Sequence, residues 1–338
     1  MTTSLPRKRL LAAGLALFAL VTAPLPAAAA EPEVLTHPLA QTEAARQAVR
    51  EYWTPARIAA MAVGDPGPGA PPVNGPDGAS VPTGTAVDRT VGRLFFVDRD
   101  GGDSSCTATL VRAANRGTLV TGGHCVLTGD LLGRDPKWHE KVLWAPGFRD
   151  NTMPHGSFVA SDLVVHRIRR DDPEQSNYDQ AFVVLGPDAQ GREAEDALGT
   201  AQKIAFNLPG NLPATEFGYP RSAGKPGHQG RPEFTGMRVA RCWGTPAQSH
   251  GSPESPAEPD MWGLPCDMGG GSSGGPRIAL LKQGTGQGVV VGVNVQGHYM
   301  DGAGKDCQRT EPDCTRHLIG PQFTAAITGK LLAVAATM

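Results

Sequence analysis

Short β-rich runs separated by turns constrain the fold of this chain more than any other feature of its sequence. Seven such runs occupy residues 91–97, 117–123, 141–145, 162–168, 180–185, 237–243 and 288–295. Gly, Pro and Asp separate them, in a chain of 338 residues with 43 glycines and 30 prolines. Many short strands without intervening helices predict an all-β fold, an antiparallel barrel or sandwich.

The first 30 residues have the layout of a secretory signal peptide. The basic residues 7–9 precede an apolar stretch at 10–21, and the alanines at 27–30 offer an A-x-A cleavage site. A membrane anchor is the alternative, but twelve residues fall short of the ~20 that a spanning helix needs. We therefore predict a secreted, extracellular protein that is cleaved after Ala30 and has no membrane association afterwards.

Residues 31–85 differ in composition from the rest of the chain. Residues 40–61 are rich in helix formers, and Pro55 divides them into two short predicted helices. Half of the 24 residues at 62–85 are Gly or Pro, which predicts a linker with too little apolar surface to order itself. The layout predicts a helical pro-segment and linker, and hence a zymogen; a permanent N-terminal extension is the alternative.

The remaining residues, 86–338, are long enough to form one large domain. Residues 322–338 have the apolar spacing of an amphipathic C-terminal helix, although Gly329 weakens that pattern. The formal net charge of -2 gives no support to binding of nucleic acid or of an anionic membrane.

An even number of cysteines fits an exported protein with three disulfides. The six cysteines are Cys106, Cys125, Cys242, Cys266, Cys307 and Cys314. Six cysteines allow fifteen pairings, so their order along the chain leaves the connectivity open. The sequence has no CxxC pair and no HExxH motif, and we expect neither a metal site nor a cofactor.

Three separate stretches carry residues suited to nucleophilic catalysis. His124 follows a β-rich run, Asp179 precedes another, and Ser272 and Ser273 lie within a glycine-rich loop at 269–275. Successive spacings of 55 and 94 residues give the order His, Asp, Ser, one of the orders in which this triad occurs. Each residue also has a simpler reading: a structural histidine, an aspartate that caps a turn, and a flexible glycine-serine linker.

Together these stretches resemble the trypsin-like, chymotrypsin-fold serine peptidases, in particular their secreted bacterial, glutamyl-endopeptidase-like branch. TGGHC at 121–125 is similar to the histidine block of that family, YDQA at 178–181 to its aspartate block, and GSSGGP at 271–276 to its serine block. FGYP at 217–220 also resembles the secreted bacterial members. The resemblance extends from about residue 91 to the C-terminal helix.

The resemblance implies two packed six-stranded β-barrels with the active site in the cleft between them. It makes Ser273 the nucleophile, His124 its general base and Asp179 the residue that orients the histidine. The oxyanion hole would consist of the backbone N–H groups of Gly271 and Ser273, which leaves no room there for side chains. We accordingly expect a secreted serine endopeptidase, a monomer that acts on protein or peptide substrates.

The family also suggests how the cysteines pair. It implies a disulfide between Cys106 and Cys125, next to the catalytic histidine. Cys307 with Cys314 would then close a local loop, which leaves Cys242 with Cys266.

The sequence departs from the family pattern at three positions. Ser272 replaces the aspartate that captures the new N-terminus in the animal enzymes, so activation through that ion pair is not expected. Asn294 stands where glutamyl endopeptidases place a histidine, which disfavours a strong preference for Glu. Asp267, six residues before Ser273, matches the acidic base of a trypsin-like pocket, so we predict cleavage after Arg or Lys if its side chain points into that pocket; a surface position is the alternative.

Two other functions are compatible with parts of the sequence. The serine loop also fits the G-x-S-x-G motif of α/β-hydrolases, but an exported esterase of that fold needs its histidine last and alternating strands and helices. An inactive binding protein with a peptidase fold is the other alternative, and nothing at the three triad positions indicates a loss of activity.

Overall fold

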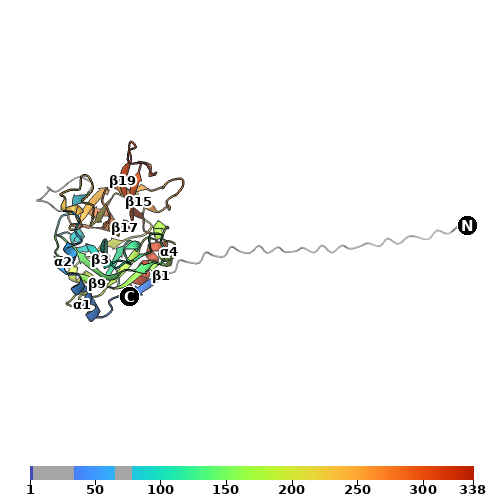
Figure 1. Ribbon diagram of the computed structural model, residues 1–338. Helices are drawn as coiled ribbons and strands as arrows, with labels where there is room; N and C mark the ends of the chain where they lie inside the picture. The colour runs from blue at the N-terminus through green and yellow to red at the C-terminus, as the bar shows by residue number, and fades with distance from the viewer. Residues whose placement is uncertain (3–33, 65–77) are drawn as a thin grey trace. The chain divides into compact units, whose positions relative to one another are not determined.

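The computed structural model describes residues 1–2, 34–64 and 78–338, so residues 3–30 of the predicted signal peptide and 65–77 of the predicted linker lie outside these ranges. Six antiparallel strands close a barrel in the first half of the chain (Figure 1). In their order around the barrel they are β9 (Phe158–His166), β10 (Ala181–Leu185), β5 (Thr118–Thr121), β4 (Asp103–Val111), β3 (Val91–Val97) and β8 (Glu140–Pro146). The predicted all-β class and the first barrel are confirmed.

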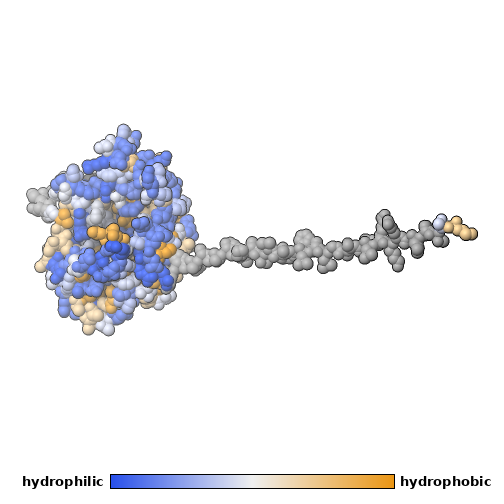
Figure 2. Space-filling view, turned by 45° about the vertical axis from the view of Figure 1, so that its right-hand side comes forward, coloured by the Kyte–Doolittle hydropathy of each residue, from blue (hydrophilic) through white to orange (hydrophobic). Residues whose placement is uncertain are grey.

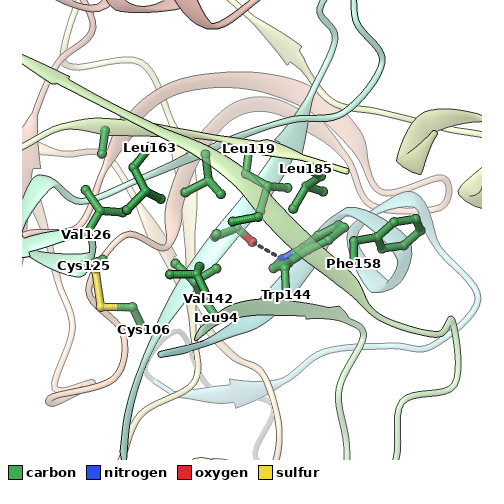
Figure 3. Close-up of a cluster of buried hydrophobic side chains, with 14 of the residues drawn as sticks. Leu94, Cys106, Leu119, Cys125, Val126, Val142, Trp144, Phe158, Leu163 and Leu185 are labelled. Carbon is green, nitrogen blue, oxygen red and sulfur yellow. Dashed lines mark hydrogen bonds between the residues drawn. A yellow bond between two sulfur atoms is a disulfide. The ribbon is translucent and has the colours of Figure 1, made fainter. Parts of the chain in front are cut away.

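Apolar side chains fill the interior of this barrel, and the indole of Trp144 among them forms a hydrogen bond to a strand (Figure 3). Trp144 lies next to Phe158, with ring centroids 6.0 Å apart, and its Nε1 donates to the carbonyl of Ala108 at 3.2 Å. The disulfide between Cys106 and Cys125 borders the same cluster. It joins β4 to the segment after β5, so the barrel wall is covalently linked to the loop that carries His124.

The second half of the fold consists of two sheets. The first has the order β11 (Lys203–Ile204), β17 (Gln287–Val293), β16 (Pro276–Lys282), β12 (Ala214–Gly218), β13 (Ala240–Gly244) and β2 (Ala79–Ser80). The second has the order β14 (Ala247–Gln248), β15 (Met261–Pro265), β19 (Thr315–Pro321) and β18 (Gln296–Met300). A bridge between Gly292 and Gln322 joins them. The second barrel is therefore split into two hydrogen-bonded sheets, because the chain changes sheets after β13, after β15 and again after β17.

The remaining elements are short. They are β6 (Leu127–Thr128), β7 (Lys137–Trp138), α3 (Ala86–Thr90), α4 (Arg167–Asp171), α5 (Ala194–Leu198), η1 (Gly123–Cys125), η2 (Ser176–Tyr178) and η3 (Pro232–Phe234). At the C-terminal end a π-helical turn, η4 (Ala325–Gly329), leads into α6 (Lys330–Ala335). The predicted C-terminal helix is thus present but shorter, and the change of helix type coincides with Gly329.

The N-terminal segment, residues 34–64, packs on the first barrel. Its strand β1 (Val34–Pro38) pairs antiparallel with β9, and helices α1 (Glu43–Tyr52) and α2 (Pro55–Ala59) follow, divided at Pro55 as predicted. Trp53 is 3% exposed, lies 5.5 Å from the ring of Phe95, and donates from Nε1 to the carbonyl of Lys141 at 2.6 Å. The segment is therefore part of the folded core, which its composition alone did not indicate.

All three disulfides agree with the predicted pairing: Cys106–Cys125, Cys242–Cys266 and Cys307–Cys314. In the part of the chain that the structure describes, no helix has the length and apolar character needed to span a membrane. Polar residues predominate on the face of the molecule in Figure 2, with small apolar patches between them.

Candidate active site

Strand pairing brings His124 and Asp179 together. Thr121, at the end of β5, pairs with Ala181, at the start of β10. His124 lies three residues after Thr121, and Asp179 lies two residues before Ala181. Both therefore lie at the same end of this strand pair. The Asp179 carboxylate accepts twice from His124: Oδ2 lies 2.8 Å from Nδ1, and Oδ1 lies 2.7 Å from the backbone nitrogen.

The contact between the two side chains keeps Asp179 ionised and determines which nitrogen of a neutral His124 carries the proton. Burial alone would raise the pKa of Asp179, but the charges of His124 and Arg169 hold that pKa at about 2. Arg169 Nε lies 3.7 Å from Oδ1 of the same carboxylate. Because the ionised carboxylate accepts from Nδ1, the proton of a neutral His124 lies on Nδ1 and the lone pair on Nε2. Nε2 is thereby the basic nitrogen.

The glycine-rich loop between β15 and β16 distinguishes its two serines. Ser272 is completely buried, and its Oγ has no hydrogen-bond partner in residues 34–64 or 78–338. Ser273 is partly exposed. Gly271 and Gly274 flank the pair with φ of +94° and +75°, values that side chains disfavour. The sharp backbone turn thus buries one hydroxyl and leaves the other serine accessible.

Direct backbone contacts dock this loop beside the histidine. A Cβ added to Gly274 would lie 2.7 Å from the nitrogen of Gly122, and one added to Gly122 would lie 3.3 Å from the ring of His124. The Thr107 N–H donates to the Ser273 carbonyl at 2.8 Å. Its hydroxyl donates to the Gly271 carbonyl at the same distance. The loop with both serines therefore lies against the segment that carries His124.

Asn294 lies beneath the loop and is not exposed to a substrate. Its side chain is 1% exposed and donates to the carbonyls of Phe217 and Ser272 at 3.1 and 3.5 Å. Its backbone bonds both to Gly274 and to Gly275, at 2.7 and 2.8 Å. Asn294 supports the shape of the serine loop from below.

Asp267 lies among cations. Its carboxylate is 34% exposed and lies 3.2 Å from Lys225 Nζ, 3.1 Å from Arg316 Nε and 3.4 Å from His228 Nε2. A hollow of about 560 Å³ adjoins it, with Arg309 and Arg316 among the lining residues. The negative charge of Asp267 is therefore already compensated within the protein.

The sulfur and nitrogen atoms near His124 do not form a metal site. Cys106, His124 and Cys125 offer potential ligand atoms within 4.8 Å of one another. Both sulfurs are bonded to each other in the disulfide, so neither can act as a thiolate ligand.

The sequence did not identify two residues that support the candidate site, Thr107 and Arg169. Thr107, which donates to the carbonyls of Gly271 and Ser273 in the serine loop, stands on β4 outside the three sequence blocks, and Arg169 contacts Asp179 from α4. The position of Thr107 immediately after Cys106 was the only available signal.

Comparison with solved structures places this geometry in a known fold. A thermostable serine protease, AL20, from an extremophilic microorganism is 27% identical over 75% of this chain and 100% of its own, with a TM-score of 0.58. The fold is that of the trypsin-like serine peptidases. The protease Anisep from Arthrobacter nicotinovorans is 24% identical over 75% of this chain and 98% of its own, with a TM-score of 0.59.

A glutamyl endopeptidase solved in complex with MPD also has this peptidase fold. It is 21% identical over 78% of this chain and 99% of its own, with a TM-score of 0.53. No family model and no curated protein matches the sequence. The trypsin-like fold agrees with the resemblance drawn from the three sequence blocks, and a glutamyl endopeptidase is among the solved structures that share it.

Proposed function

We propose that this protein is a secreted serine endopeptidase that hydrolyses peptide bonds through Ser273, His124 and Asp179. The contact that carries the proposal is the double acceptance by Asp179 from His124, at 2.7 and 2.8 Å, in a trypsin-like fold. This pair orients an imidazole with its basic nitrogen free, beside a loop with one accessible serine. A metal ion or cofactor has no role in the proposed reaction.

Each residue has a defined task in the reaction. His124 Nε2 removes the proton from Ser273 Oγ as the oxygen attacks the carbonyl carbon of the substrate. The backbone N–H groups of Gly271 and Ser273 stabilise the oxyanion. His124 then protonates the leaving amine, an acyl-enzyme remains, and water releases it by the same steps in reverse order.

Asp179 supports this cycle without exchanging protons. Its pKa of about 2 keeps the carboxylate ionised at neutral pH, so it stabilises the imidazolium that forms during attack. Arg169 assists by its charge, since it favours the ionised form of Asp179.

We also propose export by way of the signal peptide 1–30. The oxidised state of all six cysteines fits an extracellular protein. Ser272 is neutral and packed against Gly218, where an added Cβ would approach within 2.8 Å of Oγ. Activation through an ion pair at Ser272 is therefore not part of the proposal. The buried contacts of residues 34–63 argue against their removal from the folded protein. Removal of residues 31–85 as a pro-segment stays a prediction, and N-terminal sequencing of the mature protein tests it.

The residue preferred before the cleaved bond is a separate question. Compensation of Asp267 by Lys225 and Arg316 argues against a free carboxylate for a substrate Arg or Lys. Matched peptides with Arg, Phe or Glu at this position, cleaved by the wild type and by Asp267→Ser, decide it. A preference for Arg that disappears in the variant would restore the prediction from sequence.

The proposed function is tested with a fluorophosphonate probe and a peptide library. We expect the probe to label Ser273 in the wild type and not in Ser273→Ala, and the library to be cleaved only by the wild type. A protein that stays unlabelled and cleaves nothing would be an inactive binding protein. A labelled protein that hydrolyses esters but no peptides would be an esterase.

A further inference from the structure

A hollow of about 650 Å³ lies near the serine loop, and the N-terminal segment forms most of its wall. Its lining includes Arg57, residues 60–63, Asp103 and Arg221. Val63 fixes this wall to the second half of the fold, because its N–H donates to the Thr235 carbonyl at 3.1 Å. The hollow is thus bounded by the N-terminal segment, by β4 and by the segment after β12.

Arg221 connects the hollow to the serine loop. Its backbone N–H donates to the Gly270 carbonyl at 2.7 Å. A Cβ added to Gly271 would lie 3.3 Å from Arg221 Cγ. A peptide that extends past Gly271 therefore meets the Arg221 side chain as it enters the hollow.

The course of β4 indicates which part of a substrate reaches the hollow. Thr107 contacts the serine loop, Cys106 is bonded to Cys125 beside His124, and Asp103 lines the hollow. In the proposed reaction the leaving amine takes its proton from His124, the residue beside this disulfide. Asp103 stands four residues before Thr107, about 13 Å along an extended strand, so an extended peptide would reach the hollow two to four residues after the cleaved bond.

The charges in the hollow favour an acidic side chain. The Asp103 carboxylate is already occupied, since it accepts from Arg57 Nη1 and from Tyr52 Oη, each at 2.7 Å. Arg221 makes no side-chain ion pair or hydrogen bond with any residue in 34–64 or 78–338 that the structure records, and its Nε is buried without an acceptor. A second guanidinium lies near it, because Arg93 Nη2 and Arg221 Cγ approach the same face of Gly236. Burial and the charge of Arg221 lower the pKa of Arg93 to about 9, so Arg93 is still charged at neutral pH.

We propose that Arg221 and residues 60–63 form a subsite for an Asp or Glu of the substrate, two to four residues after the cleaved bond. This inference rests on the proposed peptidase function and names a substrate feature that the triad alone does not select. Residues 60–63 would then contact the substrate in the active protein. Their removal as part of a pro-segment would destroy the subsite.

The test measures kcat/KM for quenched fluorescent peptides that share one accepted sequence before the cleaved bond. Glu, Gln or Lys is placed in turn at the second, third and fourth residue after it. We expect an advantage of about tenfold for Glu over Gln at one of these positions, the size of a charge-assisted hydrogen bond. Arg221→Gln should abolish that advantage and Arg221→Glu should transfer it to Lys, whereas Arg134→Gln, at an exposed arginine, should keep it.

A second variant guards against a folding defect in the Arg221 substitutions. Ala62→Trp fills the hollow without a change of charge, and it should reduce kcat/KM for the long peptides but not for peptides that end one residue after the cleaved bond. A flat response to Glu, Gln and Lys, or an advantage of Glu that survives Arg221→Gln, would overturn the subsite while cleavage continues. Absence of both cleavage and fluorophosphonate labelling would instead refute the proposed function, and the subsite with it.

Discussion

Glu216 and Arg277 stand directly opposite each other on the paired strands β12 and β16, with Oε1 and Nη1 3.9 Å apart and neither side chain more than 1% exposed. Arg277 is held by the carbonyls of Gly320 and Pro321, at 3.0 and 3.1 Å. Neither carboxylate oxygen of Glu216 has a hydrogen-bond partner among the residues that the structure describes. Within this part of the chain, the guanidinium of Arg277 is therefore the charge that compensates the buried acid, without a hydrogen bond between them.

This pair predicts a pH-dependent loss of stability. Burial raises the pKa of Glu216 to about 8, against the opposing charge of Arg277. The folded protein thus holds a proton that the unfolded chain releases near pH 4.5, and the stabilisation from this group falls as the pH rises from about 4.5 to 8. At about 1.4 kcal/mol per pKa unit, the loss is a few kcal/mol.

Glu216→Gln removes this dependence and should be relatively more stable at pH 8 than at pH 4.5. Denaturant unfolding of the wild type and the variant across this range measures the difference, with the exposed substitution Glu51→Gln as control. A difference between wild type and Glu216→Gln that is constant with pH would contradict the assignment.

Asp179→Asn should leave the protein folded but lower kcat by about 10³–10⁴-fold, because the amide no longer fixes the reactive tautomer of His124. Since the folded pKa of Asp179 is depressed to about 2, its stabilisation is present above pH 3.8 and is lost as the pH falls through 2. Acid unfolding between pH 4 and 2 should accordingly be less steep in the variant. The exposed Asp171→Asn serves as control, and normal turnover by Asp179→Asn would exclude the proposed role.

Replacement of Cys106 and Cys125 by serine should destabilise the protein by about 3 kcal/mol, since the disulfide closes a loop of 19 residues. The Cys307–Cys314 bridge closes only 7 residues, and its removal should cost about 2 kcal/mol. Only the first replacement should also lower kcat, because it frees the His124 loop. Equal losses of activity in both variants would indicate a general folding defect.

Trp53→Ala should destabilise the protein by about 3–5 kcal/mol, as expected for a large aromatic side chain removed from a core. Arg57→Ala, four residues further along the chain, should have a much smaller effect, because its ion pair with Asp103 is partly exposed. Equal, small effects of both substitutions on urea midpoints would mean that the N-terminal segment is only loosely attached.

The sequence allowed the strands to be predicted because a strand depends largely on local chemistry, and β3 has the predicted bounds 91–97. His124 and Asp179 were predicted from two separate sequence blocks, and strand pairing brings their side chains into contact. The choice of Ser273 over Ser272 depended on the resemblance, since each serine stands at the centre of a G-x-S-x-G pattern. The backbone turn at Gly271 then explains the difference in their exposure.

Other features could not be predicted because they depend on distant partners. β1 has an unremarkable sequence and exists as a strand only through its pairing with β9. Asp267 was placed by its spacing from Ser273, but Lys225 and Arg316, which surround it, come from remote segments. Spacing along the chain gives a position in a loop and does not give the charges that face it.

The packing of α6 has a consequence for the order in which the chain can fold. Leu331 and Ala335 are fully buried in one cluster with Val164 and Phe182 from the first barrel. Both residues follow β19, the last strand in the described part of the chain, so a nascent chain in which α6 is still inside the ribosome lacks part of its central core. This delay would suit the export proposed above, in which the polypeptide passes through a translocation channel in an extended state.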